Sequence, residues 1–275
     1  MGAATMPQAS SIIDQLKPLR EHGPAAHTTG LADDTIVRFA RHDSRLPETV
    51  QAAVAEFEKL REEEPDLLAM NEDDQVAGIQ AGFINFYPED AVNPYVALAA
   101  RGPWIVTLKG AVIHDSAGYG MLGFGHAPPA VLEAMNRKQV MANVMTPNVS
   151  QKRLYEALCR EIGHTRKEGC PMDRFLCLNS GSEAVGLAAR ISDANAKLMT
   201  DPGGRHASKQ IRFVSLTGGF HGRTDRPAQF SDSSRQTYVR HLASFRDQDR
   251  LITVEPNNIE QLKQIFQWAD HNKVF

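Results

Sequence analysis

The hydrophobic positions in the first hundred residues are spaced for helices rather than strands. After Pro47 an apolar residue recurs every three or four positions, at Val50, Ala53, Val54, Phe57 and Leu60. This spacing places the side chains on one face of an α-helix. Pro47 suits the first turn of that helix, and Pro65 disfavours a helical residue before it, so the helix should end near Glu64. A second helical pattern covers residues 74–86, whereas residues 1–45 show weak periodicity and are interpreted as an arm lying over the rest.

From about residue 100 the pattern changes to short apolar runs that alternate with helical stretches. Two such runs flank Lys109 and Gly110, which predicts a β-hairpin. Further strands are expected at 175–178, 211–216 and 251–254, and helices after Pro128, from Ser150, and at 183–198 and 259–269. Alternating strands and helices indicate βαβ units and a largely parallel sheet. We therefore predict an α/β fold for residues 101–275, preceded by an N-terminal helical extension, residues 1–100.

Composition narrows the class of protein. The 275 residues carry 30 Lys and Arg against 33 Asp and Glu, a net charge of −3. A dedicated nucleic-acid binder normally shows a basic excess, so we expect no nucleic-acid partner. No apolar run is long enough for a membrane span, and the start of the chain lacks a signal-peptide pattern. Three cysteines without C-x-x-C spacing argue against a disulfide framework or a zinc site. These features predict a cytoplasmic globular protein without a metal site.

The first glycine-rich segment, Gly118–Gly123, has the spacing G-x-G-x-x-G. A dinucleotide fingerprint needs these glycines between a strand and a helix, with an acidic residue about 20 positions further on. Here the next helix starts only after Pro128, and no strand ending in Asp or Glu follows at that distance. A nucleotide-dependent oxidoreductase that uses the 118–123 glycine loop is therefore kept only as a third hypothesis.

A second segment, 178–184, closes a predicted strand and opens a predicted helix. A helix N-terminus offers free backbone N–H groups and a positive dipole end, which accept a phosphate. Gly181 and Ser182 are the candidates for such contacts. The alternative is purely structural, because Ser180 and Glu183 also have the spacing of a capping box.

A third segment, Thr217–Thr224, follows the predicted strand 211–216. Loops after the carboxyl ends of parallel strands line the ligand crevice of such sheets, so this loop and the one after Leu178 should open on the same edge. Phe220 could stack on a flat ring while Gly181 and Ser182 hold its phosphate. The structural alternative makes Phe220 a core aromatic and His221 a hydrogen-bonded turn residue.

These motifs together resemble a known family. Residues 125–134 (GHAPPAVLEA), 179–184 (NSGSEA) and 218–224 (GGFHGRT) are similar, in order and spacing, to successive motifs of the class III aminotransferases, pyridoxal-phosphate enzymes of fold type I. The resemblance implies a partial large domain of that fold and usually a homodimer. It implies pyridoxal 5'-phosphate as cofactor, with Gly181 and Ser182 at the phosphate, Phe220 on the ring and His221 beside it. It also implies transfer of an amino group from an amine or amino acid to a keto acid or aldehyde.

The chain departs from the family pattern in one respect. The family's Schiff-base lysine and the aspartate at the pyridine nitrogen follow the region that ends here. Glu255–Pro256 is interpreted as a helix start and Lys273 as a surface lysine, so no catalytic residue is assigned. We expect an incomplete portion that is inactive alone, with Tyr119 and His126 as substrate-side candidates. The alternative is a non-catalytic binding or scaffold protein that retains the first half of the fold.

Overall fold

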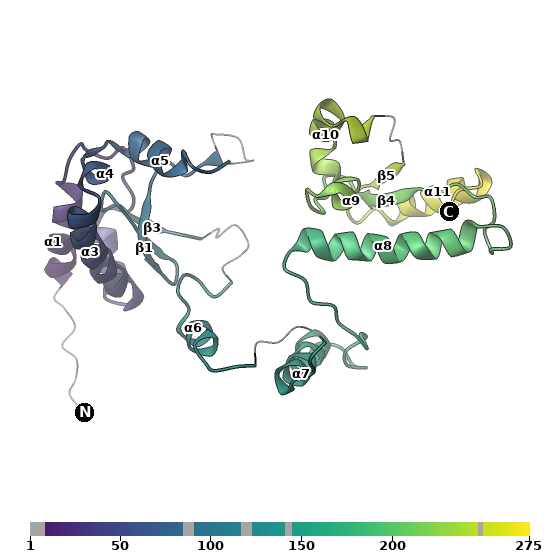
Figure 1. The fold of residues 1–275 in the computed structure, drawn as a ribbon, viewed down its shortest axis with the longest axis horizontal. Coiled ribbons are helices and arrows are strands. Elements are labelled where there is room, and N and C mark those ends of the chain that lie inside the picture. Colours follow the sequence, from purple (N-terminus) through teal and green to yellow (C-terminus); the bar gives the residue numbers. More distant parts are fainter. Residues whose placement is uncertain (1–8, 85–90, 117–122, 141–144, 247–249) are drawn as a thin grey trace. The chain divides into compact units, whose positions relative to one another are not determined.

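A computed structural model describes residues 9–84, 91–116, 123–140, 145–246 and 250–275 of the chain (Figure 1). The chain divides into two compact units, Met1–Met141 and Ala142–Phe275. The expected boundary at residue 100 lies inside a β-strand of the first unit, Ala97–Arg101. The contacts therefore divide the chain about 40 residues later than the sequence pattern suggested, because that strand pairs with the predicted hairpin.

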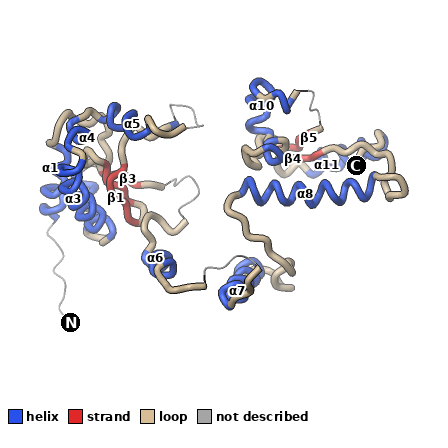
Figure 2. The backbone as a smooth tube through the Cα atoms, viewed as in Figure 1, coloured by secondary structure: helices blue, strands red, loops and turns tan. Residues whose placement is uncertain are grey.

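The first unit is built of helices around a small antiparallel sheet (Figure 2). The sheet has the order β1-β2-β3, with β1 at Ala97–Arg101, β2 at Trp104–Thr107 and β3 at Val112–His114. The β2–β3 pair is the predicted hairpin, in which Trp104 lies opposite His114. The helices are α1 (Ala9–Arg20), α2 (Asp33–Ala40), α3 (Arg45–Glu63), α4 (Pro65–Ala69), α5 (Glu72–Gln80) and α6 (Pro129–Met135).

The predicted helix at Pro47 is confirmed as α3, which packs on β1 and β2. Its periodic positions Val50, Ala53 and Phe57 are buried, as the amphipathic pattern requires. Pro65 ends α3 and opens α4 at once, since proline is tolerated in a first helical turn. The hydrophobic core of this unit thus forms between α3 and the sheet.

The prediction for residues 1–45 was wrong over residues 9–45, the part of this range that the structure describes. These residues are not an arm, because α1 and α2 contribute Leu16, Leu19 and Ile36 to the core, each fully buried. The signal was present in the spacing of Ile12, Leu16 and Leu19, but Pro18 lies inside α1 and interrupts the pattern that a helix normally shows. The helix expected at 74–86 is α5, which begins earlier because Asn71 caps it through Asp74 N at 2.8 Å.

Asp43 links the start of α3 to the buried side chain of Trp104. Its carboxylate accepts hydrogen bonds from Arg45 at 2.8 Å and from Trp104 Nε1 at 2.9 Å. The hydrogen bonds from Arg45, and then from Trp104, outweigh the effect of burial and lower the pKa of Asp43 to about 2.

This pKa shift predicts a pH dependence of stability. The folded state favours the carboxylate, so its stabilising contribution is complete above the unfolded pKa of about 4 and is lost as the pH falls to about 2. Asp43→Asn should therefore flatten the pH dependence of first-unit stability within that window. Urea unfolding at several pH values between 2 and 5 checks this, and parallel curves for both proteins would contradict it.

The second unit contains a parallel pair of strands, β4 (Phe213–Leu216) and β5 (Leu251–Val254). Both strands were predicted. On the other side of β4, Val274 forms a parallel bridge with Gln210, so the chain here adds a third row to the sheet. The helices are α7 (Val149–Gly163), α8 (Gly181–Thr200), α9 (Asp225–Ala228), α10 (Arg235–His241) and α11 (Ile259–His271), with 3-10 turns η3 (Asp232–Ser234) and η4 (Ala243–Phe245).

The strand expected at 175–178 does not form. These residues have no regular secondary structure, and Leu176 and Leu178 are exposed. A strand needs a neighbour to accept its hydrogen bonds, and no pairing partner for this segment lies among the described residues. The helix expected after Pro128 is α6, a short helix that ends at Met135.

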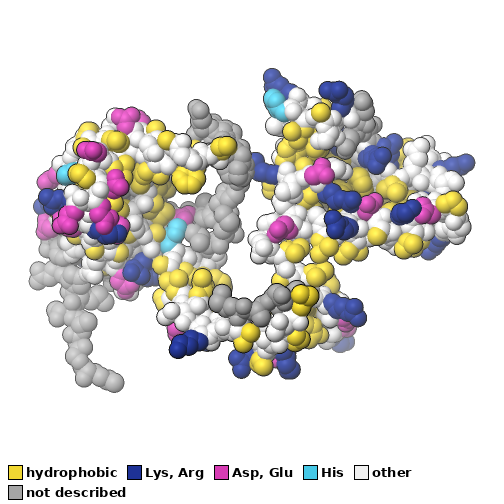
Figure 3. Space-filling model, in the orientation of Figure 1, with side chains coloured by type: hydrophobic (Ala, Val, Ile, Leu, Met, Phe, Trp, Pro, Cys, Tyr) yellow, Lys and Arg dark blue, Asp and Glu magenta, His cyan; other side chains and the backbone are white. Residues whose placement is uncertain are grey.

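The second unit exposes many large apolar side chains, which appear in yellow along α8 in Figure 3. In α8 only Ala196 is buried, whereas Ile191 and Leu198 are exposed. Across the described residues, no helix is both long and apolar enough to cross a membrane.

Candidate functional site

The N-terminus of α8 presents two backbone N–H groups. Ser180 is the N-cap, and its Oγ accepts from Glu183 N at 3.2 Å while its carbonyl accepts from Ala184 N at 3.1 Å. The first four N–H groups of a helix lack partners within it. Those of Gly181 and Ser182 therefore remain for a ligand. The cap and the phosphate interpretation are compatible, because they use different N–H groups.

The loop Thr217–Thr224 starts where β4 ends. Thr217 N donates to Val254 O at 2.9 Å, which joins the loop to the carboxyl end of β5. Gly219 N donates to Leu216 O at 2.9 Å, and Gly218 N donates to the carboxylate of Asp232 at 2.8 Å. Three backbone donors therefore fix the first turn of this loop at the carboxyl edge of the strands.

Ser231 holds the second half of the loop. This side chain is fully buried, accepts from His221 N at 2.9 Å, and lies within donating distance of Gly222 O (2.9 Å) and Pro227 O (3.1 Å). Its single proton serves one of these two carbonyls at a time. Ser231 and Asp232 were not identified from the sequence, where they form part of an ordinary Ser-Asp-Ser-Ser turn.

Removing this hydroxyl should loosen the loop. Ser231→Ala removes the acceptor of the partly buried His221 N, which costs about 0.5–1.5 kcal/mol. We expect faster amide hydrogen exchange at His221 and Gly222, with exchange in β1–β3 unchanged. Ser233→Ala is the matched control, because that exposed serine contacts the loop through its backbone N. Equal exchange rates in the two variants would contradict the assignment.

The ring of His221 is held by Ser215. Nε2 of His221 lies 3.1 Å from Ser215 Oγ, and Ser215 Oγ donates to Phe230 O at 2.9 Å. Because the serine proton is used on Phe230, Ser215 accepts from His221, which assigns the proton to Nε2. His221 is a hydrogen-bonded loop residue, as the structural alternative proposed.

Phe220 is not a core aromatic. Its side chain is 54% exposed, and the guanidinium of Arg223 lies 5.6 Å from its ring centroid. This distance is in the range of a cation–π contact. An exposed ring on a backbone-anchored loop is available for stacking.

The structure brings the two predicted segments together. Gly222 has φ of +122° and lies against Ser182, so that a Cβ there would overlap Ser182 Oγ and lie 2.9 Å from Pro227 Cβ. By contrast, no atom lies within 4 Å of a Cβ at Gly181, which leaves open space before the helix. The N-terminus of α8 and the loop 217–224 therefore form one surface, which we call the cradle (Gly181, Ser182, Phe220, His221 and Gly222).

The remaining candidates from the sequence are Tyr119, the 118–123 glycine loop and His126. Tyr119 is outside the described residues, as is most of the 118–123 glycine loop. Helix α6 begins at Pro129, well after Gly123, so it does not open directly from those glycines. His126 belongs to the first unit, where its Nε2 lies 2.9 Å from Asp115 Oδ2.

Three lysines of the second unit, Lys197, Lys209 and Lys273, lie away from the cradle. Lys209 and Lys273 flank the Gln210–Val274 bridge, at the amino end of β4, whereas the cradle is at its carboxyl end. Lys197 is in the last turn of α8 and pairs with Asp201. Lys273 is exposed, as expected, and Glu255–Pro256 leads into α11, which Asn258 caps.

Comparison with known proteins gives a consistent result. A family model described as aminotransferase class-III matches residues 86–268. A probable 4-aminobutyrate aminotransferase of Bacillus subtilis is 31% identical over 134 residues, 48% of this chain and 28% of its own length. A glutamate-1-semialdehyde 2,1-aminomutase of Methanocorpusculum labreanum is 30% identical over 143 residues, 50% of this chain and 30% of its own length. The matches thus span less than a third of these curated relatives.

Two solved structures share the fold. An ornithine aminotransferase from Toxoplasma gondii aligns with a TM-score of 0.53 at 16% identity, over 78% of this chain and 46% of its own. A taurine:2-oxoglutarate aminotransferase from Bifidobacterium kashiwanohense, solved with pyridoxal phosphate and glutamate, aligns with a TM-score of 0.50 at 15% identity, over 74% and 46%. These likenesses confirm the predicted α/β, fold type I class for the part of the fold that this chain covers.

Proposed function

The chain belongs to the class III aminotransferase family, and on that premise we propose that it forms the part of an aminotransferase that holds pyridoxal phosphate by its phosphate and ring. The observation that carries this proposal is the cradle, in which a helix N-terminus with two free N–H groups lies against a loop with an exposed aromatic ring. Each feature was predicted from a separate motif, and Gly222 of the loop lies against Ser182 at the start of the helix.

The cradle fits the cofactor. Gly181 N, Ser182 N and the Ser182 hydroxyl would donate to the phosphate, with the dipole of α8 favouring its charge. The open space at Gly181 admits close approach of the phosphate oxygens to the backbone. Phe220 would stack on the pyridine ring, while Ser215 keeps His221 in place beside it. When bound, pyridoxal phosphate supplies the electron sink for transfer of an amino group from an amine or amino acid to a keto acid or aldehyde.

We assign the cradle residues to binding of the cofactor rather than to catalysis. Lys209, Lys273 and Lys197 lie at the opposite strand edge or helix end from the cradle. We propose that this chain alone binds the cofactor but does not transfer amino groups. We further propose a homodimeric, cytoplasmic whole protein; the three free cysteines, Cys159, Cys170 and Cys177, suit a reducing compartment.

An amino-transfer assay tests this division. The chain is supplied with pyridoxal phosphate, 2-oxoglutarate and, in turn, ornithine, 4-aminobutyrate and taurine, donors suggested by the names of its relatives. We expect glutamate formation no faster than with free cofactor. The same assay on a protein that continues this chain with a lysine-bearing segment should form glutamate with at least one donor. Transfer by the chain alone, or none by the longer protein with any donor, would contradict the proposal.

The scaffold alternative fits less well. A stand-alone binding protein should bury its apolar faces. The second unit instead exposes Leu154, Ile191, Leu198 and Phe266. These side chains are instead expected to be covered in the whole protein.

A further inference from the structure

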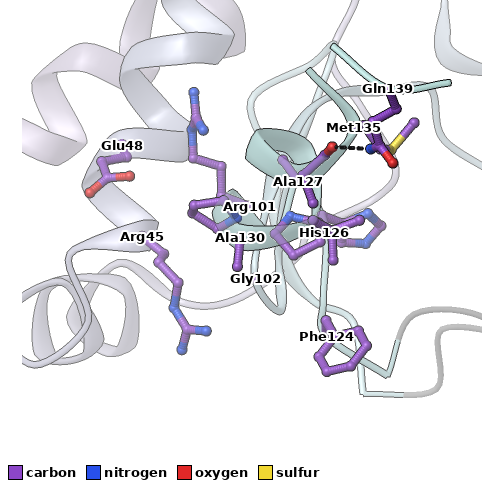
Figure 4. A pocket seen from close by; sticks show the side chains of 14 residues that line it. Arg45, Glu48, Arg101, Gly102, Phe124, His126, Ala127, Ala130, Met135 and Gln139 are labelled. Carbon is purple, nitrogen blue, oxygen red and sulfur yellow. Dashed lines mark hydrogen bonds between the residues drawn. The ribbon is translucent and has the colours of Figure 1, made fainter. Parts of the chain in front are cut away.

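The first unit contains a cavity that the proposed function does not use. It is a half-open hollow of about 600 Å³, within the size range of small-molecule sites. Helix α6, the end of β1 and the start of α3 surround it, and all of its lining residues belong to the first unit (Figure 4). Its wall is mainly apolar and includes Phe124, Ala130, Val131, Ala134 and Met135.

The backbone around the cavity is firmly held. Gly102 and His126 exchange two backbone hydrogen bonds, each 2.8 Å long, and this bridge sets the entry into α6. Gly125 has φ of +76°, and a Cβ there would lie 2.8 Å from the backbone of Gly102, so only glycine permits this approach. The His126–Asp115 contact adds a side-chain anchor. The cavity is therefore a built feature of the unit rather than a gap beside a free helix.

Two arginines line the cavity, but in the part of the chain that the structure describes a carboxylate balances the positive charge of only one of them. Arg45 is bound by both carboxylate oxygens of Asp43 at 2.8 Å. Arg101 has no hydrogen bond or ion pair within the described residues, and its Nε is buried without an acceptor. In Figure 4 the two guanidinium groups point away from each other, and among the described residues the carboxylate of Asp43 pairs with Arg45 and not with Arg101. Glu48, the acidic residue of the lining, is exposed and lies beyond ion-pair distance from Arg101.

An incompletely paired guanidinium beside an apolar wall matches one ligand chemistry. A carboxylate would accept hydrogen bonds from the terminal nitrogens of Arg101, and an apolar body would cover Phe124, Val131 and Met135. We propose that this cavity binds a small monocarboxylate with an apolar body, through Arg101. This site is separate from the cradle and does not depend on the proposed aminotransferase function.

The test uses two probes with the same body. We titrate the chain with 3-phenylpropionate and with 3-phenylpropan-1-ol, which lacks the charge, and map binding by amide chemical shifts. We expect the carboxylate to bind at least about tenfold more tightly than the alcohol, with shifts at Gly102, His126 and Ala134, because a charge-assisted hydrogen bond contributes that much. No binding of the carboxylate, or shifts confined to the second unit, would overturn the proposal.

Matched variants assign the charge. Arg101→Gln should weaken binding of 3-phenylpropionate at least about tenfold and leave binding of the alcohol unchanged. Arg61→Gln is the control, because that arginine lies on the exposed face of α3 and pairs with Glu58. Ala134→Phe, which fills the cavity from α6, should weaken both probes. Wild-type affinity for the carboxylate in Arg101→Gln would overturn the assignment, and circular dichroism of each variant verifies that it is folded.

Discussion

Replacing Trp104 with alanine should destabilise the first unit by about 3–5 kcal/mol, the largest effect expected from a single substitution in this chain. Trp104 is the largest fully buried side chain of the core. Its ring lies 5.3 Å from Phe39 and 5.0 Å from His114, centroid to centroid. Its removal leaves a cavity between α2, α3 and the sheet, and takes one donor from Asp43.

Hydrogen exchange is the appropriate measurement, because a chain of two units need not unfold in one step. The amides of Ile105 and Val106 should lose protection, whereas those of β4 and β5 should not. Trp104→Phe is the control: it keeps most of the packing and loses only the bond to Asp43, so its effect should be about 1–2 kcal/mol. Equal losses in the two variants would show that the hydrogen bond, rather than the packing, dominates.

Replacing Gly222 with valine should disrupt the cradle. The residue has φ of +122°, a conformation that costs other residues about 1–3 kcal/mol. Its side chain would also press on Ser182 Cα, 3.1 Å from a Cβ, and on Pro227. Ser182 Oγ can rotate, but the backbone and the proline ring cannot. We expect at least about 2 kcal/mol lost from the second unit and a large decrease in binding of a pyridoxal phosphate analogue.

Gly218→Ala separates the effect of backbone strain from the effect of steric overlap with Ser182 and Pro227. Gly218 lies in the same loop with φ of +69°, but nothing lies within 4 Å of a Cβ there. This variant should lose about 1 kcal/mol from backbone strain and keep its affinity for the analogue. If Gly218→Ala weakens binding of the analogue as much as Gly222→Val does, the contact with Ser182 does not determine the shape of the cradle.

The sequence predicted those parts of the fold in which local pattern and tertiary contact agree. Helix α3 has a regular apolar stripe between two prolines, and β4 and β5 are short apolar runs that the parallel sheet requires. It failed at 175–178, where an apolar run has no pairing partner among the described residues, and at α1, where Pro18 interrupts the helical pattern. The first outcome depends on the surroundings of the segment, and the second on a residue inside it.

In the candidate site, too, some residues could be predicted from local pattern and others could not. Gly181, Ser182, Phe220 and His221 could be selected because glycine and aromatic residues follow predicted strand ends. Their support could not be selected, since Ser231 acts through three backbone groups that only the folded loop brings around it. The lack of an acceptor for Arg101 Nε among the described residues is likewise a property of its surroundings and leaves no mark in the sequence.

Binding of 4'-deoxypyridoxine 5'-phosphate tests the central claim, that the cradle holds a phosphorylated pyridine. This analogue has the ring and the phosphate but no aldehyde, so it does not react with surface lysines. We expect a dissociation constant below about 1 mM, at least about tenfold weaker binding without the phosphate, and amide shifts at Gly181, Ser182 and Phe220. Equal affinity with and without the phosphate would contradict the claim. So would amide chemical shifts at the N-terminus of α8 that do not change on binding.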